Sequence, residues 1–410
     1  MANDIILMQK RELEKKLQER FIERKQELKE SGDMIRVITG PRRAGKSFFA
    51  MHALKNFGYA NFDDEKLAET KDYDDILNAI SQAYGSPKYI FFDEIQNLPK
   101  WELFVNRLQR QGYKLVLTGS NSNLLSMELA SHLTGRHIPI TLLPFSFAEF
   151  LDFKGKELTE SEKRAGLEQY MIYGGYPEPL VKNIDYKEYL SALLSSTIYK
   201  DIVKRHKIRK PQAIEGLALY LLSNIAREFS YNTLATLTKC KSVHSAERYL
   251  GFLEETFLFF TISRLSFSAK KSINSGKKIY CIDNGLVYAK SMSLSPDKGR
   301  LYENLVAIAL KKKELNSELK VYYWKNEKQE EVDFAVKEGQ NVAQLIQMCA
   351  SCADMPERET RALIKASGEL KCDNLLVITE QDESEKTISW FGMEKKIKFM
   401  PLWKWLLEQK

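Results

Sequence analysis

The sequence is poor in cysteine and contains no long apolar run. Five cysteines among 410 residues form an odd and sparse set, which favours a reducing compartment over a disulfide framework. No apolar run approaches the roughly 20 residues that span a bilayer. One of the longest, TFLFFTI at 256–262, is typical of a buried strand. The first residues, MANDIILMQKRELEKK, lack the apolar core and cleavage site of a signal peptide. We therefore expect a cytoplasmic protein without a membrane segment.

Basic charge is concentrated in one part of the chain. The net charge is +7, but residues 200–278 hold 15 Lys and Arg against 6 Asp and Glu. The remaining residues hold 47 against 49. A basic segment attracts polyanions, nucleic acid first among them. The alternative is a solvated basic surface without a partner.

The order of apolar segments predicts an α/β protein of several domains. A charged helix is expected over 8–31, within an amino-terminal segment of 1–33. From 34 to 155, strands alternate with helices, which predicts a domain with a parallel sheet covered on both faces. We expect a helical lid or connector at 156–212, a winged-helix-like domain at 213–290 and a mixed α/β domain at 291–410. The expected strands of the parallel sheet are MIRVIT, YANF, YIFFDE, KLVLTGS and HIPITLL.

A phosphate-binding motif follows the first of these strands. The run MIRVITGPRRAGKSFFAMHAL is a strand, a glycine-rich loop and a helix, and the loop fits G-x-x-x-x-G-K-S. Its glycines let backbone N–H groups turn toward a phosphate at the positive end of the helix. Lys46 is expected to reach the β- and γ-phosphates, and Ser47 to bind Mg²⁺. The predicted cofactors are therefore ATP and Mg²⁺. The expected cofactor-binding residues are Gly40, Pro41, Arg42, Arg43, Ala44, Gly45, Lys46, Ser47 and Phe48.

Two further strands end in polar residues. The strand KYIFFDEIQN places two acids at its carboxyl end, where ligands of open α/β sheets bind. Asp93 is expected to hold Mg²⁺, and Glu94 to orient the attacking water. The strand KLVLTGSNS ends in Ser120 and Asn121, either of which is a candidate sensor of the γ-phosphate. These residues together predict ATP hydrolysis.

The motif order resembles that of the AAA+ ATPases, with Walker A, Walker B, sensor 1 and an arginine finger in sequence. More narrowly, it is similar to bacterial and archaeal ATPases that carry an uncharacterised carboxyl-terminal domain. The motifs span almost the whole chain: TGPRRAGKS, FFDEIQ, LTGSNSNLL, LTGR, LLPFSFAEF, YGGYPEP, KIYCIDNGL, GRLYENLVA and EEVDFAV. A sensor 2 arginine, present in many AAA+ proteins, does not stand out here.

The resemblance implies that Arg136 is an arginine finger that reaches the γ-phosphate of a neighbouring subunit. The active species would then be a homo-oligomer. The alternative is an arginine at a helix end that interacts with the helix dipole.

The middle of the chain predicts a winged helix. In the stretch 228–265, the helix SVHSAERYLGFLEET would be the recognition helix, followed by two strands. Basic residues here suit phosphate contacts, but winged helices also dock proteins, so both partners remain open. The exposed candidates are His244, Glu247 and Arg248 on that helix, with Lys239 and Lys241 in the turn before it.

The carboxyl-terminal segment resembles the restriction-endonuclease-like fold. The stretch EEVDFAVKEGQNVAQLIQMC predicts two strands around a glycine-containing turn. Glu303 and Asp333 match the helix and strand acids of that fold. Gln347 and Cys349 stand where its glutamate and lysine are expected. Glutamine is a weak neutral metal ligand, and cysteine supplies no cation. We therefore expect a degenerate nuclease site with impaired or absent cleavage.

Several alternatives remain at this point. Glu330 or Glu331 with Lys365 would restore an active metal-dependent DNA nuclease. Cys349 and Cys352 form a C-x-x-C pair, but a zinc site needs further ligands. The favoured expectation is an ATP-driven switch that engages nucleic acid through its carboxyl-terminal modules. A regulator that docks an unknown protein partner under the control of ATP is the main alternative.

Overall fold

The computed structural model describes residues 2–29, 32–120, 136–155, 157–238, 242–266, 276–291, 297–349, 356–390 and 392–409. The chain divides into two compact units. The first comprises Met1–Pro144, Tyr176–Asn183 and Glu255–Phe257, and the second comprises Phe145–Gly175, Ile184–Glu254 and Leu258–Lys410. No helix of the described ranges combines the length and the apolar character that crossing a bilayer demands.

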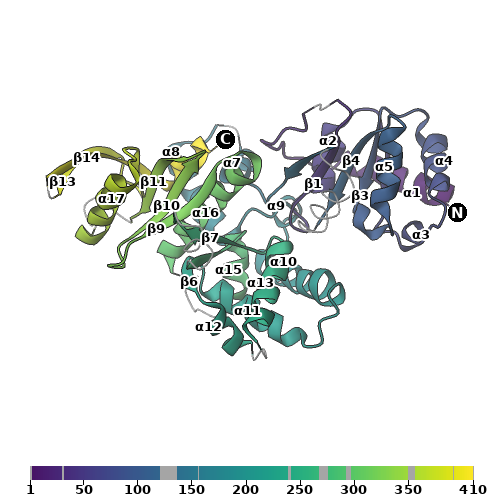
Figure 1. Ribbon diagram of the computed structural model, residues 1–410. Coiled ribbons are helices and arrows are strands. Elements are labelled where there is room, and N and C mark those ends of the chain that lie inside the picture. Colours follow the sequence, from purple (N-terminus) through teal and green to yellow (C-terminus); the bar gives the residue numbers. More distant parts are fainter. Residues whose placement is uncertain are drawn as a thin grey trace. The chain divides into compact units, whose positions relative to one another are not determined.

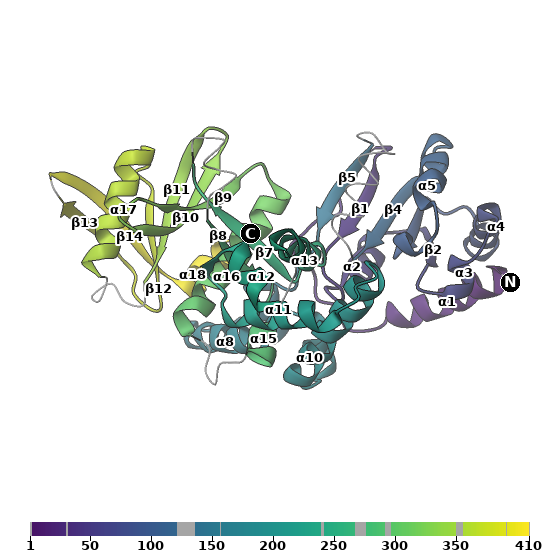
Figure 2. The ribbon, with the colours of Figure 1, turned by 60° about the horizontal axis from the view of Figure 1, so that its bottom comes forward.

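The first unit is built on a five-stranded sheet of order β2-β3-β4-β1-β5. Figure 1 labels β1, β3 and β4 of this sheet, and Figure 2 labels β2 and β5 as well. All of its strand pairs are parallel, which confirms the predicted parallel sheet. The carboxyl ends of the strands therefore share one edge. The strands are β1 (Ile35–Thr39), β2 (Phe57–Asn61), β3 (Tyr89–Asp93), β4 (Lys114–Gly119) and β5 (His137–Thr141).

Helices cover both faces of this sheet, as the strand pattern predicts. Successive residues of a strand point to opposite faces. Accordingly, Phe92 belongs to an apolar cluster with α4 and α5, whereas Phe91 belongs to a second cluster with α2. The helices of this unit are α1 (Ala2–Lys16), α2 (Lys46–Ala53), α3 (Glu65–Ala68), α4 (Tyr73–Tyr84), η1 (Ile95–Asn97), α5 (Trp101–Arg110) and α9 (Pro177–Lys182).

The predicted continuous helix over 8–31 is wrong. Helix α1 ends at Lys16, and the described residues that follow, 17–29, contain no helix. Within them Arg24 is buried, and its guanidinium donates to the backbone oxygens of Ala44 (3.0 Å) and Leu143 (2.5 Å). These tertiary hydrogen bonds override a helical propensity that comes only from charged, solvent-compatible residues.

The second unit contains a nine-stranded sheet of order β13-β14-β12-β11-β10-β9-β7-β8-β6. Strands β10 and β11 are antiparallel and turn at Gly339, which confirms the predicted hairpin. Strand β7 pairs with β9, so strands from 213–290 and from 291–410 lie in one sheet. The strands are β6 (Arg227–Phe229), β7 (Phe259–Arg264), β8 (Lys277–Cys281), β9 (Lys320–Lys325), β10 (Glu331–Glu338), β11 (Asn341–Met348), β12 (Leu375–Thr379), β13 (Ser384–Trp390) and β14 (Met393–Pro401).

Along the chain, helices come before, between and after the strands of this sheet (Figure 2). Helices α16 and α17 pack on the strands β8 to β11. On α13, the candidates His244, Glu247 and Arg248 are all exposed, whereas Lys239 and Lys241 lie outside the described residues. The helices are α7 (Phe147–Lys154), α8 (Glu160–Tyr173), α10 (Tyr186–Ser196), η2 (Thr197–Lys204), α11 (Pro211–Ser223), α12 (Tyr231–Leu237), α13 (Val243–Glu255), α15 (Asn284–Lys290), α16 (Lys298–Asn316), α17 (Glu357–Leu370) and α18 (Leu402–Glu408).

The motifs YGGYPEP and KIYCIDNGL are far apart in sequence, but Gly174 and Gly175 of the first contact Asp283 of the second. The carboxylate of Asp283 accepts hydrogen bonds from the N–H groups of Gly175 (2.7 Å) and Gly285 (2.8 Å). A Cβ at Gly174 would lie 1.9 Å from Oδ1 of Asp283. Gly174 is therefore required for this carboxylate to approach the backbone, whereas a Cβ at Gly175 would lie 2.3 Å from the backbone oxygen of Phe145.

Candidate functional site

The phosphate loop, residues 40–47, joins β1 to α2. Gly40 has φ of 147°, and a Cβ there would lie 2.0 Å from the backbone oxygen of Leu142. Gly45 has φ of 89° and is the N-cap of α2. Both positions therefore favour glycine, as the motif predicts, and the loop ends at the amino terminus of a helix.

The side chain of Lys46 folds back over the first residues of the phosphate loop. Its side chain is 4% exposed, and Nζ donates to the backbone oxygens of Gly40 (3.1 Å) and Pro41 (2.9 Å). The ammonium is thus held beside the same turn of backbone that a phosphate would enter.

Ser47 and Asp93 are in direct contact across the sheet edge. The Ser47 hydroxyl donates to Oδ1 of Asp93 at 2.8 Å, and the Tyr59 hydroxyl donates to Oδ2 at 3.0 Å. Thr118 also donates to Oδ1. Burial and the neighbouring Glu94 raise the pKa of Asp93, and these three donors oppose that shift. A hydroxyl and a carboxylate are hard oxygen donors, so this pair fits Mg²⁺.

Glu94 follows Asp93 in a left-handed conformation. Its φ is 50°, which is uncommon for a residue other than glycine and costs of the order of 1 kcal/mol. The Glu94 N–H donates to Oγ1 of Thr118 at 3.1 Å, and the Gln96 amide donates to Oε2 of Glu94 at 2.5 Å. The strained backbone and both hydrogen bonds hold the Glu94 carboxylate at the carboxyl edge of the sheet.

Ser120 lies at the same edge. Thr39 and Gly119 are partners in the register of β1 and β4, so Ser120 comes next to the first glycine of the loop. It is buried, with 6% exposed. The other sensor candidate, Asn121, lies outside the described residues.

Arg136 lies at the opposite edge of the sheet. The Ile35 N–H donates to the Arg136 backbone oxygen at 3.0 Å, at the amino end of both β1 and β5. The length of β1, about 13 Å at 3.3 Å per residue, separates it from the phosphate loop. Arg136 is exposed, and its guanidinium donates to Gln109 at 3.3 Å. The structure therefore does not bring Arg136 to the phosphate loop of its own chain.

The sequence motifs miss several residues that support the phosphate loop. Arg24, Tyr59 and Thr118 contact the loop or its acid as described above. Arg43 pairs with Glu178 of α9 at 2.6 Å. Sequence signals exist for some of these contacts: Thr118 lies in LTGSNSNLL, and Glu178 lies in YGGYPEP.

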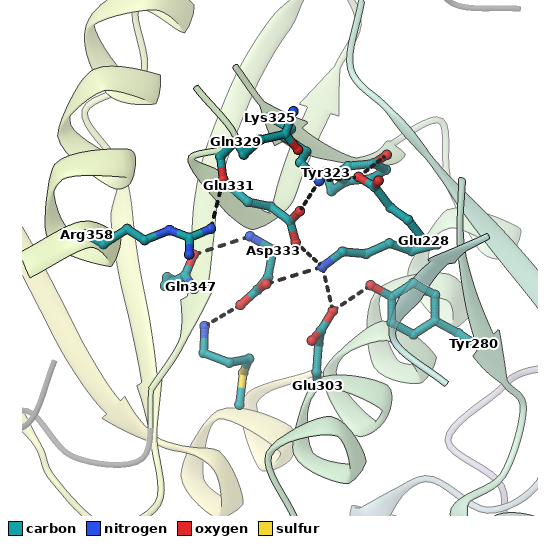
Figure 3. Close-up of polar contacts among 12 residues, drawn as sticks. Glu228, Tyr280, Glu303, Tyr323, Lys325, Gln329, Glu331, Asp333, Gln347 and Arg358 are labelled. Carbon is teal, nitrogen blue, oxygen red and sulfur yellow. Dashed lines mark hydrogen bonds and ion pairs between the residues drawn. The ribbon is translucent and has the colours of Figure 1, made fainter. Parts of the chain in front are cut away.

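A second group of charged residues lies in the other unit. The ammonium of Lys278, on β8, is 3.0 Å from Oε1 of Glu303, 2.6 Å from Oε1 of Glu331 and 3.4 Å from Oδ1 of Asp333. We call these three acids the acidic cluster. Their side chains point toward one another from α16 and β10 (Figure 3).

Glu303, Asp333 and Gln347, which the sequence predicts as a degenerate nuclease site, lie close together, with an unexpected lysine among them. The Asp333 N–H donates to Oε1 of Gln347 at 3.3 Å, and the Tyr280 hydroxyl donates to Oε1 of Glu303 at 2.8 Å. Burial raises the pKa of Glu303 to about 7, although the nearby Lys278 lowers it. The sequence interpretation counts Lys278 as part of a basic surface, but its side chain is 4% exposed.

The rescue of a nuclease site by Glu330 and Lys365 does not match the geometry. The Glu330 carboxylate pairs with Lys365 (2.7 Å) and Arg361 (2.5 Å), and the bond from Lys365 helps to lower its pKa to about 2. Glu331, not Glu330, joins the acidic cluster. Within the described ranges no group of three or more His, Cys, Asp or Glu has the arrangement of a metal site. Cys352 of the C-x-x-C pair lies outside those ranges.

The parallel sheet, its phosphate loop and the Ser47–Asp93 contact are arranged as in a phosphate-loop nucleotide-binding domain. Residues 33–151 match a family described as an AAA domain. Residues 164–297 and 298–405 match two domains of unknown function, DUF8612 and DUF4143.

Two curated proteins resemble the chain over most of its length. An uncharacterized protein of Methanocaldococcus jannaschii is 35% identical over 411 residues, which cover 95% of this chain and 91% of that protein. The chain therefore belongs to the family of this archaeal protein. An uncharacterized protein of Haemophilus influenzae is 31% identical, over 68% of this chain and 74% of that protein.

A solved structure of the replication initiator DnaA, bound to AMPPCP and single-stranded DNA, aligns at 16% identity with a TM-score of 0.29. It covers 55% of this chain and 83% of that chain.

Proposed function

We propose that this protein binds ATP with Mg²⁺ at the phosphate loop and hydrolyses it to ADP and phosphate. The observation that carries the proposal is the 2.8 Å contact between Ser47 and Asp93, with Glu94 next to it in a strained conformation. Ser47 lies at the start of α2, which follows β1, and Asp93 ends β3. Strand β4 separates β1 from β3, and the two side chains converge at the edge where the phosphate loop lies.

Each residue has a distinct role in this proposal. Backbone N–H groups of the phosphate loop and the ammonium of Lys46 hold the phosphates. Ser47 and Asp93 hold Mg²⁺, which neutralises charge on the phosphates when bound. Glu94 orients the attacking water, and Ser120 contacts the γ-phosphate from the end of β4.

Arg136 acts on the nucleotide of a neighbouring subunit in this proposal, so that the active species is a homo-oligomer. What supports this role is its exposure and its place at the sheet edge opposite its own phosphate loop. An arginine there reaches a γ-phosphate only when a second chain presents one.

The carboxyl-terminal modules engage nucleic acid in this proposal, in the reducing environment of the cytoplasm. The order of α11, β6, α12, α13, β7 and β8, with β8 between β6 and β7, supports a winged helix. Exposed basic residues in and after η2 support contact with phosphates. They are Lys200, Lys204, Lys207, Arg209 and Lys210. Lys278 is buried and is not available for such contact.

The last segment serves as a platform that does not cleave DNA. A restriction-endonuclease-like fold is supported by Glu303 on α16, Asp333 on β10 and Gln347 on β11, which follow the order expected for its site. The two groups that the cleavage chemistry most needs are replaced by Gln347 and Cys349.

Lys46→Ala tests the nucleotide site. The variant should lose binding of a fluorescent ATP analogue with Mg²⁺, because the ammonium that neutralises the phosphates is gone. Lys55→Ala, at an exposed lysine just after α2, is the matched control and should bind normally. Binding of the ATP analogue by K46A at the wild-type affinity would show that the nucleotide does not bind at the phosphate loop.

Binding of duplex DNA at rising salt separates a nucleic-acid partner from a protein partner. A contact driven by phosphates weakens steeply as salt increases, roughly in proportion to the number of phosphates neutralised. No DNA binding at low salt would favour the regulator that docks a protein.

A further inference from the structure

The ammonium of Lys278 occupies the centre of the acidic cluster. All three carboxylates approach it within 3.4 Å, and the side chain of Lys278 is 4% exposed. The carboxylates are shielded too, with side-chain exposures of 12% for Glu303, 24% for Glu331 and 12% for Asp333. Such a group is stable only if charges of both signs are present, because an unpaired buried charge is very costly.

The surroundings keep Lys278 charged. Burial alone would lower its pKa, but Glu303, Tyr280, Asp333 and Glu331 together raise the pKa well above its usual value. The ammonium also lies over the ring of Tyr323, 5.5 Å from the centroid, which favours a cation.

The acids that surround this ammonium are the kind that bind a divalent cation. Glu303 and Asp333 come from two elements, Gln347 adds an amide oxygen beside Asp333, and Glu331 adds a third carboxylate. Distances of 2.6 to 3.4 Å to Nζ exceed the roughly 2.0–2.1 Å typical of Mg²⁺ ligands. The cluster is therefore spaced for an ammonium, and shifts of about 0.5 to 1.4 Å would close it around Mg²⁺.

We propose that Lys278 is a built-in cation that takes the place of a divalent metal in the acidic cluster. The wild-type cluster then binds no metal, and removal of the ammonium turns it into a site for Mg²⁺ or Mn²⁺. This inference does not depend on ATP hydrolysis at the phosphate loop.

The built-in cation also links two parts of the chain that match separate families. Lys278 lies within 164–297, whereas the acidic cluster lies within 298–405. Strand β8 therefore supplies charge that the acids of the last segment need. Lys325 is closer in sequence to that cluster, but it contacts only Glu331 of the three acids, at 3.4 Å, and also Glu228 at 2.8 Å.

The variant Lys278→Ala, made in the full-length, nucleotide-free protein, tests the proposal. Binding of Mn²⁺ is titrated and measured in two ways, by calorimetry and by the electron paramagnetic resonance signal of free Mn²⁺. The wild type should show no site that depends on Asp333. K278A should gain one site, at least tenfold tighter than any wild-type binding, and K278A combined with Asp333→Asn should lose it. Lys325→Ala is the matched control and should gain no site, because Lys278 still fills the cluster.

Two wild-type results would overturn the proposal. One is a Mn²⁺ site that disappears in D333N. The other is metal-dependent DNA cleavage that disappears in K278A, which would make Lys278 a catalytic lysine. A folded K278A that gains no site would overturn it equally.

The stability of K278A with and without metal also tests the proposal. If K278A unfolds without metal, millimolar Mn²⁺ should restore its circular dichroism, while Lys278→Arg should remain folded without metal because it keeps the charge. If Mn²⁺ restores the folded circular dichroism of neither K278A nor Lys278→Gln, the cluster needs an ammonium specifically, and the proposal is wrong.

Discussion

At the scale of single residues, the proposed function depends on side chains held in positions that cost free energy. Glu94 has a left-handed backbone, Asp93 is buried with three hydrogen-bond donors around it, and Lys46 is buried over its own loop. Strained and buried polar groups persist where the surrounding structure compensates for them, and they concentrate at functional sites. Each of these three residues lies at the carboxyl edge of the parallel sheet.

Glu94→Gln should bind ATP normally and hydrolyse it at least about 100-fold more slowly, because loss of a catalytic base typically costs 10² to 10⁴ in rate. Equilibrium binding of an ATP analogue and the rate of phosphate release measure the two effects. Glu65→Gln, at an exposed acid of α3, should change neither. Turnover by E94Q at the wild-type rate would disprove the role assigned to Glu94.

At the scale of elements, the segment 17–29 supports the phosphate loop instead of extending α1. Arg24 donates to Ala44 within the loop and to Leu143 after β5, and so ties together two parts of the first unit. Ile22 is the only other buried residue of this described segment, while Phe21 stacks on His52 and Leu28 packs against the apolar cluster that includes α2. The hydrogen bonds of Arg24 to buried carbonyl groups therefore add to a small set of apolar contacts.

Arg24→Ala should lower the free energy of unfolding of the first unit by about 1–3 kcal/mol, because buried carbonyl oxygens lose their donor. Urea denaturation measures the change, and binding of ATP should weaken in parallel. Arg43→Ala is the control, since an exposed pair such as Arg43–Glu178 contributes at most about 1 kcal/mol. Equal stability of the two variants would show that Arg24 does not support the loop.

At the scale of the whole molecule, the proposed ATPase site is incomplete in one chain. Arg136 lies at the sheet edge opposite the phosphate loop of its own chain. Arg136→Ala should therefore bind ATP normally yet hydrolyse it slowly. Mixing R136A with K46A should restore part of the activity, because each chain supplies the group that the other lacks.

Sedimentation of the wild type with ATP provides the second measurement for this prediction. A wild type that stays monomeric while it hydrolyses ATP would exclude an arginine finger that acts between subunits. An R136A variant with full activity would favour the alternative role at a helix end.

The sequence by itself determined the features that depend on neighbouring residues. The strand, the phosphate loop and the start of α2 are consecutive, so the sterics of Gly40 and Gly45 and the helix terminus are already present in the motif. The alternation of strands with helices likewise predicts the parallel sheet, and a single glycine predicts the turn between β10 and β11. These features depend on local backbone geometry, which residue type restricts directly.

Only the tertiary structure decided which charged groups meet. Ser47 and Asp93 are 46 residues apart, and Lys278 and Asp333 are 55 residues apart. The sequence shows the sign of each charge but not its partner, so it predicts Lys278 on a basic surface and Arg24 within a helix. Burial makes an unpaired charge or carbonyl group costly, and the chain lowers that cost with whichever partner the fold brings near. For this reason a lysine from β8 fills the acidic cluster, and an arginine from residues 17–29 holds the phosphate loop.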